Sequence, residues 1–348
     1  MEQVAMSRAF RVDHAVQSWR AERARAAGYT AEVTPYTGYG STSWVRVLGR
    51  VLLAKRSPEQ RKDTPTGARG WRSFVSVPVA NAEVSVHIGE RSFEIHADRS
   101  GLIDETVDVD LEPGWRRIGL SSEGSDVATA LVFIVDPQTT FGVVSDIDDT
   151  IMVTALPRPL LAAWHSFVVN EHARATTPGM PVLYERLTSR HPGAPLIYLS
   201  TGAWNVAPTL TRFLSRNLYP AGALLLTDWG PTADRLFRSG RQHKRGSLER
   251  FAREFPQIKW VLFGDDGQHD ESIYHDFVAQ HPDHVRAVCI RQLTPGEAVL
   301  AGSNWRGHAS SSDSPVPWIY AADGAGLADR LENIGLLESA PQQPEVEA

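Results

Sequence analysis

The chain has 348 residues, enough for two domains, and its 42% hydrophobic and 22% charged residues are typical of a soluble globular protein. The net charge of −6 argues against a nucleic-acid partner, and the single cysteine excludes an internal disulfide and a cysteine-rich metal site. Because no apolar run approaches the roughly 18 residues that a membrane-spanning helix needs, and the N-terminus lacks the apolar segment of a signal peptide, we expect a cytoplasmic protein.

Residues 1–30 are predicted to form a separate N-terminal segment with one amphipathic helix over residues 7–28. Ser7 supplies an N-cap and Gly28 a stop signal. Arginines outnumber acidic residues on this helix. The helix can therefore either pack on the protein or bind an anionic membrane surface. We favour docking on the body of the protein, since packed amphipathic helices are the commoner case. The alternative is peripheral contact with an anionic membrane surface.

Residues 31–137 are predicted to form an antiparallel β-sandwich domain. Hydrophobic residues alternate with polar ones in several stretches, among them Val84–Ile88 and Val107–Leu111, as expected for strands with one buried face. Residues suited to tight turns separate these stretches, as in Gly89-Glu90-Arg91. Several short strands in succession favour a sandwich, and the segment contains no apparent catalytic constellation.

Residues 138–300 alternate between strands and helices, which predicts an α/β domain with a Rossmann-like parallel sheet of about five strands. Apolar runs predict strands at Gly142–Ser145, Pro195–Leu199, Ala223–Leu226, Trp260–Phe263 and Ala287–Ile290. Helical patterns occur at Leu160–Ala173, Pro181–Arg190, Val206–Asn217, Ser247–Glu254 and Glu271–Gln280. In such sheets ligands bind beyond the carboxyl ends of the strands, so the polar residues that follow each strand are the site candidates.

Residues 301–348 are predicted to contain one C-terminal helix and a disordered tail. A serine-rich stretch at residues 310–315 indicates a linker, and spaced apolar residues from Leu327 to Leu337 indicate the helix. The last eight residues are acidic and rich in proline, a composition typical of disorder.

The first predicted strand of the α/β domain ends in a cluster of carboxylates. Asp146, Asp148 and Asp149 lie within four residues and Thr150 follows them. Carboxylates this close repel one another unless a positive charge lies between them. Hard oxygen ligands suit Mg²⁺, so the sequence predicts a metal site at the carboxyl end of this strand.

The other strand ends add a hydroxyl, an amine and further carboxylates. Ser200 follows the second strand, Lys244 lies in a basic stretch after the third, and Asp265 ends the fourth, with Asp270 close behind. Because these strand ends meet at one edge of the sheet, we expect the side chains to converge. Such a set of groups can bind a phosphoryl group beside a metal ion.

These features resemble the four motifs of the haloacid dehalogenase superfamily, in the same order along the chain. More narrowly, the chain resembles the catalytic domain of the actin-patch phosphatidate phosphatase family. The segments that carry this resemblance are Asp146–Thr154, Pro178–Pro181, Tyr198–Ser200, His243-Lys244 and Gly264–Asp270. Tyr36–Gly40 in the front domain fits the bacterial branch of that family.

The resemblance implies a Mg²⁺-dependent phosphatase. Asp146 would attack phosphorus and form an aspartyl-phosphate, while Asp148 would protonate the leaving oxygen and then activate the hydrolytic water. Mg²⁺ would be held by Asp146, the backbone carbonyl of Asp148 and Asp265. Lys244 and Ser200 would hold the transferring phosphoryl oxygens.

Three alternatives stay open for individual positions. Thr201 can replace Ser200 as the functional hydroxyl, and Asp266 can replace Asp265 as the metal ligand. Asp270 either orients the lysine or metal-bound water, which we favour, or ligates the metal directly.

The spacing of the motifs predicts a minimal cap, because neither interval between Thr150 and Lys244 holds a full cap domain. An open site favours a bulky or surface-bound phosphomonoester such as phosphatidate, which would yield diacylglycerol. An apolar lip at Leu160–Val168 is a candidate for peripheral membrane contact, although we favour its packing inward. The alternatives are a soluble or macromolecular phosphomonoester, or a non-catalytic binding or scaffold protein.

Overall fold

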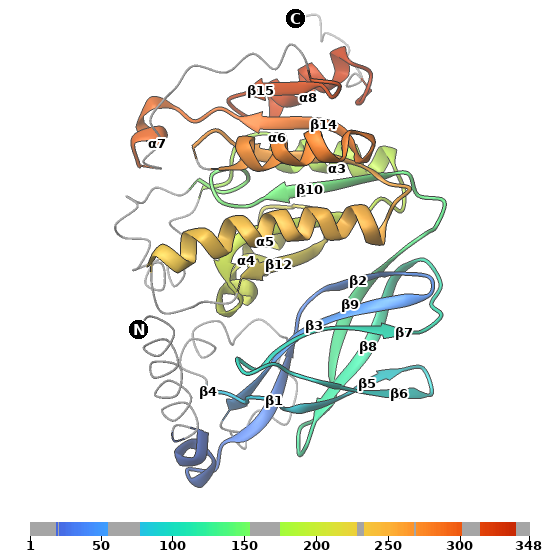
Figure 1. The fold of residues 1–348 in the computed structure, drawn as a ribbon, viewed down its shortest axis with the longest axis vertical. Coiled ribbons are helices and arrows are strands. Elements are labelled where there is room, and N and C mark those ends of the chain that lie inside the picture. Colours follow the sequence, from blue (N-terminus) through green and yellow to red (C-terminus); the bar gives the residue numbers. More distant parts are fainter. Residues whose placement is uncertain are drawn as a thin grey trace, which may run out of the picture. The chain divides into compact units, whose positions relative to one another are not determined.

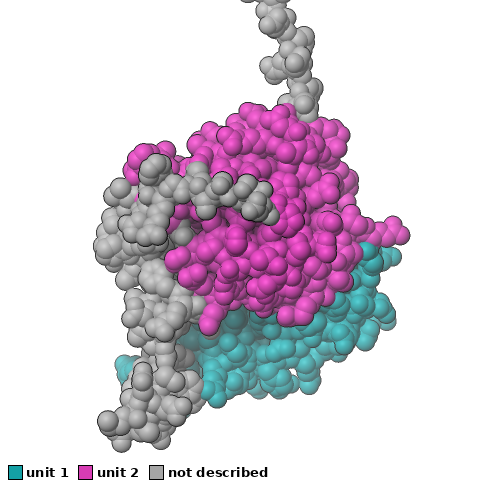
Figure 2. All heavy atoms as spheres, turned by 45° about the horizontal axis from the view of Figure 1, so that its top comes forward, with its two compact units in different colours: residues 1–137, 204–209 teal, residues 138–203, 210–348 magenta. Residues whose placement is uncertain are grey.

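The computed structural model describes residues 19, 21–54, 77–153, 175–227, 233–267, 269–300 and 314–338. The chain divides into two compact units, residues 1–137 with 204–209, and residues 138–203 with 210–348 (Figure 2). The predicted helix over residues 7–28 lies largely outside the described residues. Residues 21–26, which are described, are helical. Within the described residues, no helix has the length and apolar character needed to cross a membrane.

The first unit contains a nine-stranded sheet with the order β1-β3-β2-β9-β8-β5-β6, and β4 and β7 also pair with β3. Its described strands are antiparallel to their neighbours except for β2 and β9, which run parallel. The strands are β1 (Thr30–Pro35), β2 (Gly38–Ser41), β3 (Trp44–Ala54), β4 (Val77–Pro78), β5 (Glu83–Ile88), β6 (Arg91–His96), β7 (Leu102–Asp108), β8 (Gly114–Ser122) and β9 (Ala128–Val135).

The prediction of a largely antiparallel β domain is confirmed, but the strands join one hydrogen-bonded sheet where two sheets of a sandwich were expected. The 11-residue strand β3 is the reason, because it is long enough to pair with four other strands. Gly49 of β3, for example, pairs with Pro35 of β1 on one side and Ile103 of β7 on the other. The inward-facing residues of the sheet form one hydrophobic core.

The second unit contains a parallel sheet of six strands in the order β12-β11-β10-β13-β14-β15. The strands are β10 (Phe141–Asp146), β11 (Leu196–Ala203), β12 (Ala223–Thr227), β13 (Lys259–Asp265), β14 (Val285–Arg291) and β15 (Trp318–Ala321). The predicted parallel sheet is confirmed, with six strands where about five were expected. The additional strand, β15, is only four residues long and pairs with β14.

Helices cover both faces of the parallel sheet, with α5 and α6 in front of it and α3 and α8 behind it in Figure 1. The helices are α3 (Met180–Arg190), α4 (Ala207–Arg216), α5 (Ala233–Glu254), α6 (Asp270–Gln280), α7 (Pro295–Leu300) and α8 (Gly324–Asn333). The helix predicted at Leu160–Ala173 lies outside the described residues. Helix α5 begins well before the predicted Ser247, because basic residues fill the first turns and hide the apolar period there.

Strand β10 places the candidate site at the centre of the sheet. It is buried along its whole length between β11 and β13. Gly142 lies opposite Trp260 of β13, where a Cβ atom would come within 2.5 Å of the indole ring, so only glycine allows this packing. The chain proceeds from β10 to β11 on one side and later returns to β13 on the other. The carboxyl ends of β10 and β13 therefore flank the topological switch point, where ligands bind in such sheets.

Candidate active site

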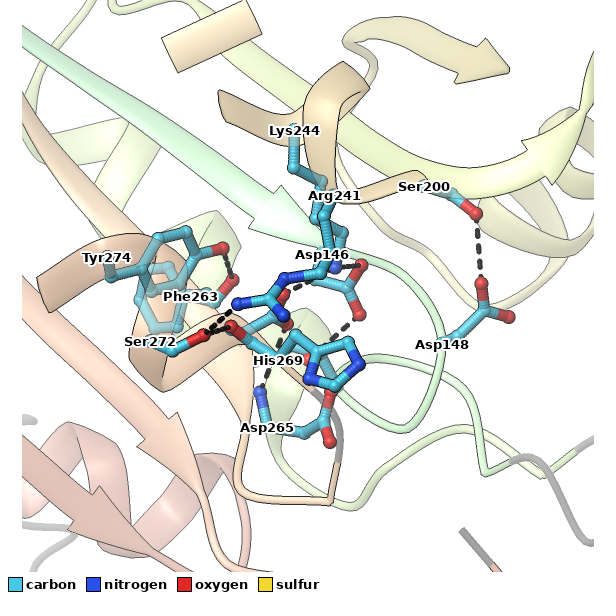
Figure 3. Close-up of polar contacts among 12 residues, drawn as sticks. Asp146, Asp148, Ser200, Arg241, Lys244, Phe263, Asp265, His269, Ser272 and Tyr274 are labelled. Atoms are coloured by element: carbon cyan, nitrogen blue, oxygen red, sulfur yellow. Dashed lines mark hydrogen bonds and ion pairs between the residues drawn. The ribbon is translucent and has the colours of Figure 1, made fainter. Parts of the chain in front are cut away.

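Asp146 is the last residue of β10 and is almost fully buried, with 1% of its surface exposed. Its Oδ1 lies 2.6 Å from the Nζ of Lys244, and its Oδ2 accepts a 3.3 Å hydrogen bond from the hydroxyl of Thr150. Burial raises the pKa of the Asp146 carboxyl, and the Lys244 ammonium opposes this effect. Asp146 is thus fixed in position with one oxygen against a cation (Figure 3).

Lys244 reaches the site from α5 and is buried. Its ammonium bridges two carboxylates, Asp146 at 2.6 Å and Asp270 at 2.5 Å. Burial alone would lower the pKa of Lys244, but the two carboxylates outweigh it and raise that pKa above its ordinary value. Lys244 is therefore a permanent cation at this site.

Asp265 is the last residue of β13 and is fully buried. Its Oδ1 accepts a 2.7 Å hydrogen bond from the backbone N–H of Gly267. Its Oδ2 is buried without a hydrogen-bond partner among the described residues. A buried carboxylate oxygen without a donor is unfavourable, so this atom is well suited to ligate a cation.

Asp146, Asp265 and Asp270 each offer one carboxylate oxygen to a common point, since the three atoms lie within 4.8 Å of one another. Burial and then the neighbouring carboxylates raise the pKa of Asp265. The effect of the neighbouring carboxylates reflects negative charge that Lys244 alone does not balance. Three hard oxygen donors with excess negative charge fit a divalent cation such as Mg²⁺.

Asp270 belongs to the carboxylate cluster itself, whereas the sequence analysis favoured a role in orienting Lys244 or metal-bound water. It begins α6, is fully buried, and contacts Lys244, as predicted for an orienting role, while also joining the carboxylate cluster. Gly264 makes this approach feasible, because a Cβ atom there would lie 2.7 Å from the Cβ of Asp270. The alternative ligand Asp266 is engaged elsewhere, since its Oδ1 accepts a 2.9 Å hydrogen bond from the backbone of Leu293.

Asp148 and Ser200 form a second group beside this cluster. The Ser200 hydroxyl donates a 2.9 Å hydrogen bond to Oδ2 of Asp148 and accepts one of 2.9 Å from the backbone N–H of Gly202. Both side chains are buried, and Figure 3 shows the Asp148 carboxylate turned toward Ser200 and away from the Lys244 ammonium. The two predicted groups are therefore adjacent to Asp146 but bonded to each other.

The turn that joins Asp148 to Thr150 is held by hydrogen bonds at both peptide units that flank Asp149. Asp149 has a φ of 58°, in the left-handed region that residues with a side chain rarely adopt. Its backbone N–H donates to the carbonyl of Met152 at 2.8 Å, and its carbonyl accepts a 2.7 Å bond from Arg291. Sequence reasoning missed Arg291; the signal was a charged residue directly after the apolar run of Ala287–Ile290.

A second cationic side chain borders the cluster. Arg241 lies one turn before Lys244 on α5, and its Nη2 donates a 3.2 Å hydrogen bond to the hydroxyl of Ser272. That hydroxyl in turn donates to the carbonyl of His269 at 2.9 Å. Figure 3 shows the Arg241 guanidinium and the His269 ring beside Ser272, next to the buried carboxylates.

Comparison with known proteins agrees with the predicted resemblance. Residues 141–292 match the family described as phosphatidate phosphatase APP1, catalytic domain. Phosphatidate phosphatase APP1 of Saccharomyces cerevisiae is 26% identical over 153 residues, which cover 43% of this chain and 25% of that protein. An uncharacterized protein of Schizosaccharomyces pombe is 24% identical over 152 residues, with the same two shares of 43% and 25%. The chain thus spans about a quarter of the length of these curated relatives.

Among solved structures, a carbohydrate acetylesterase from Xanthomonas citri aligns with 79% of this chain and 73% of its own. The identity is 8% and the TM-score 0.27, which is too low to indicate a common fold. The family match, in contrast, covers β10 to β14 and every site residue described above. Residues 141–292 are therefore similar to the catalytic domain of the phosphatidate phosphatase APP1 family.

Proposed function

We propose that this chain is a phosphoric monoester hydrolase in which Asp146 is the nucleophile and Mg²⁺ the metal cofactor. The family match supports the reaction class, since the yeast relative is a phosphatidate phosphatase. The observation that carries the assignment to residues is the buried cluster in which Lys244 lies 2.6 Å from Asp146 and three carboxylates converge. This is the arrangement that phosphoryl transfer needs, because its catalysis rests on positioning and charge neutralisation.

In the first step, a carboxylate oxygen of Asp146 attacks phosphorus and the bond from phosphorus to the leaving oxygen breaks, which yields an aspartyl-phosphate. Lys244 keeps the attacking carboxylate in place and balances charge on the phosphoryl oxygens. Asp148 donates a proton to the leaving alkoxide, which departs as an alcohol.

In the second step, Asp148 accepts a proton from water, and the resulting hydroxide attacks phosphorus. The bond to Asp146 breaks and inorganic phosphate leaves, so the enzyme returns to its starting state. Ser200 donates to Asp148 in the structure, and we propose that it orients this carboxylate between the two proton transfers and contacts a phosphoryl oxygen.

Mg²⁺ would be held by Asp146, Asp265 and Asp270, together with the backbone carbonyl of Asp148, and would neutralise charge on the phosphoryl group. The fit rests on the buried Oδ2 of Asp265, which lacks a donor among the described residues. We include Asp270 because its carboxylate joins the cluster from the start of α6.

For the substrate we propose phosphatidate, with diacylglycerol as the product, acted on at a membrane surface by a cytoplasmic enzyme. The name of the yeast relative supports this choice. Arg241 at the border of the cluster supports an anionic substrate of any size. We also propose that the fold is of the haloacid dehalogenase type with a minimal cap, which the parallel sheet and the motif order support.

Hydrolysis of an aryl phosphate tests the reaction class. We expect the wild-type chain to release phosphate in the presence of Mg²⁺ and Asp146→Asn to be inert, because the amide is a poor nucleophile. Asp104→Asn, a change far from the site in sequence and in the other unit, is the control and should retain full activity. Equal and negligible rates in the wild type and Asp146→Asn would instead support a non-catalytic binding or scaffold protein.

A pair of substrates with the same phosphate group tests the lipid proposal. Phosphatidate in detergent micelles carries acyl chains, and glycerol 3-phosphate has the same phosphomonoester without them. We expect kcat/KM to be at least tenfold higher for phosphatidate. A preference for the soluble compound would retain the phosphatase chemistry and replace the lipid with a soluble metabolite.

A further inference from the structure

Arg291 is a buried cation that the mechanism above does not use. It is the last residue of β14 and pairs in register with Asp265, the last residue of β13. Only 4% of its surface is exposed. A buried arginine is stable only when its donors are bonded, so its partners indicate what it holds in place.

The guanidinium of Arg291 binds three separate parts of the second unit. Nη1 donates to the carbonyl of Asp149 at 2.7 Å, and Nε donates to the carbonyl of Ala322 at 3.2 Å. Nη2 pairs with the carboxylate of Glu297 at 2.6 Å. Glu297 is itself fixed, because its other oxygen accepts bonds from the backbone and hydroxyl of Thr294 at 2.8 and 2.9 Å.

The contact between Arg291 and Asp149 constrains the turn that joins Asp148 to Thr150. Asp149 is buried, has its backbone in the left-handed region, and separates the proposed acid–base Asp148 from Thr150. Aspartate adopts this conformation more readily than most residues with a side chain, but it still carries a strain that the surroundings must offset. The Arg291 bond to the Asp149 carbonyl supplies that constraint from outside the turn, since rotation of this peptide would break it.

We propose that Arg291 is a positioning residue that fixes the Asp149 peptide and thereby sets Asp148 and Thr150 around Asp146. Glu297 and the carbonyl of Ala322 hold the guanidinium in the required orientation. Both partners lie beyond residue 292, so the segment after the family match contributes to the site. The proposal rests on the proposed phosphatase function for its kinetic consequence, but its structural content is independent of that function.

Arg291→Met and Arg291→Lys test this role, with Arg286→Met as the matched control because Arg286 is an exposed arginine on the same strand. Misplacement of catalytic groups by about 1 Å costs on the order of 100-fold in rate. We therefore expect kcat for an aryl phosphate to fall about 100-fold in Arg291→Met, with KM changed less than about threefold. Lysine can bond one of the three partners, so Arg291→Lys should be intermediate, and Arg286→Met should match the wild type.

Amide hydrogen exchange gives a readout that does not depend on activity. In both Arg291 variants, exchange should accelerate in the peptide that covers residues 147–153 more than in peptides from β11 or β12. A wild-type kcat and unchanged exchange at this turn in a folded Arg291→Lys would overturn the proposal, even if Arg291→Met does not fold. Uniformly faster exchange along the whole second unit would also overturn it, because that result denotes a general structural role.

If the wild type hydrolyses no phosphomonoester, the phosphatase proposal fails and exchange at residues 147–153 alone decides the role of Arg291. If the wild type is active and the Arg291 variants retain its kcat and its exchange, the positioning role fails and the phosphatase stands. The two failures are therefore distinguishable.

Discussion

Ser200 and Asp148 lie 52 residues apart in the sequence and are joined by a 2.9 Å hydrogen bond from the Ser200 hydroxyl to the carboxylate Oδ2. The hydroxyl also accepts a bond from the Gly202 backbone, so its proton points at the carboxylate. This arrangement orients the proposed acid–base group relative to Asp146. Ser200 is therefore bonded to the Asp148 carboxylate, and its contact with a phosphoryl oxygen stays a prediction.

Ser200→Ala should reduce kcat for an aryl phosphate at least tenfold. A hydrogen bond to a charged group contributes about 1.5 kcal/mol or more, which corresponds to about tenfold in rate. Ser200→Thr keeps the hydroxyl and should retain most of the activity. Ser189→Ala on α3 is the control, because the Ser189 hydroxyl donates to Glu185 of its own helix. Full activity in Ser200→Ala would show that Asp148 needs no help to keep its orientation.

Lys244→Met should reduce kcat by a factor on the order of 100 to 1,000, as expected when one donor to a transferring group is lost. It should also destabilise the fold by about 3 kcal/mol or more, because it leaves the Asp146 and Asp270 carboxylates buried without their cation. The control is Arg245→Met, since Arg245 follows on the same helix but is exposed and pairs with Asp276. Steady-state kinetics and chemical denaturation measure the two effects.

Retention of more than half of the wild-type kcat in Lys244→Met would contradict the role given to this residue. A loss of stability without a loss of rate would leave Lys244 as a structural counter-ion for the carboxylates. Mg²⁺ should restore part of the lost stability, since a divalent cation can replace the missing positive charge.

The five strands predicted from apolar runs are all present, because strands buried on both faces are apolar along their whole length. β10 and β13 are examples, with every residue of β10 buried. The first half of α5 and the whole of β15 were not predicted. The early turns of α5 are basic, so no apolar period is visible there. β15 is apolar, but its four residues are too few to identify a strand.

Site positions could be predicted because the carboxyl ends of parallel strands meet at one edge of the sheet, which brings Asp146 and Asp265 together. The bonds among the side chains could not be predicted in the same way. Lys244 and Asp270 both lie on helices, and their 2.5 Å contact depends on how those helices pack against the sheet. The reach of Arg291 to Asp149 likewise depends on the backbone of a turn whose φ the sequence does not specify.

Removal of divalent cations should abolish turnover, and added Mg²⁺ should raise the melting temperature. Binding to the folded state alone stabilises it by about 2.7 kcal/mol when the ligand is at 100 times its Kd. Asp265→Asn should remove most of this thermal shift, because the buried Oδ2 is the atom best placed for a cation. Asp266→Asn is the matched control and should keep the shift, since the Asp266 carboxylate bonds the Leu293 backbone.

The comparison of these two variants also decides which of the adjacent aspartates is the ligand. Loss of the Mg²⁺-dependent shift in Asp266→Asn, with the shift intact in Asp265→Asn, would reverse the assignment. A melting temperature that does not respond to Mg²⁺ in the wild type would contradict a divalent-cation site at this cluster.

Cys289 should be unreactive in the native protein. Cys289 lies in the apolar run Ala287–Ile290, which predicted a strand, and it is fully buried in β14 between β13 and β15. Burial raises the pKa of the thiol, so the reactive thiolate is scarce in the folded state at pH 8. An aromatic disulfide reagent should therefore modify one thiol rapidly in guanidinium chloride and only slowly in buffer.

The pH dependence of stability has a definite sign for this group. An unfolded thiol has a pKa of about 8.5 and releases its proton above that pH, whereas the buried thiol retains it. The unfolded state then binds fewer protons, so the contribution of Cys289 to stability is complete below about pH 8.5 and declines as pH rises above it. Cys289→Ala should show a smaller decline between pH 8 and 10 in denaturation experiments. If the native thiol is instead modified faster than the protein unfolds globally, β14 must open locally. The four-residue strand β15 would then not be enough to protect Cys289 from the reagent.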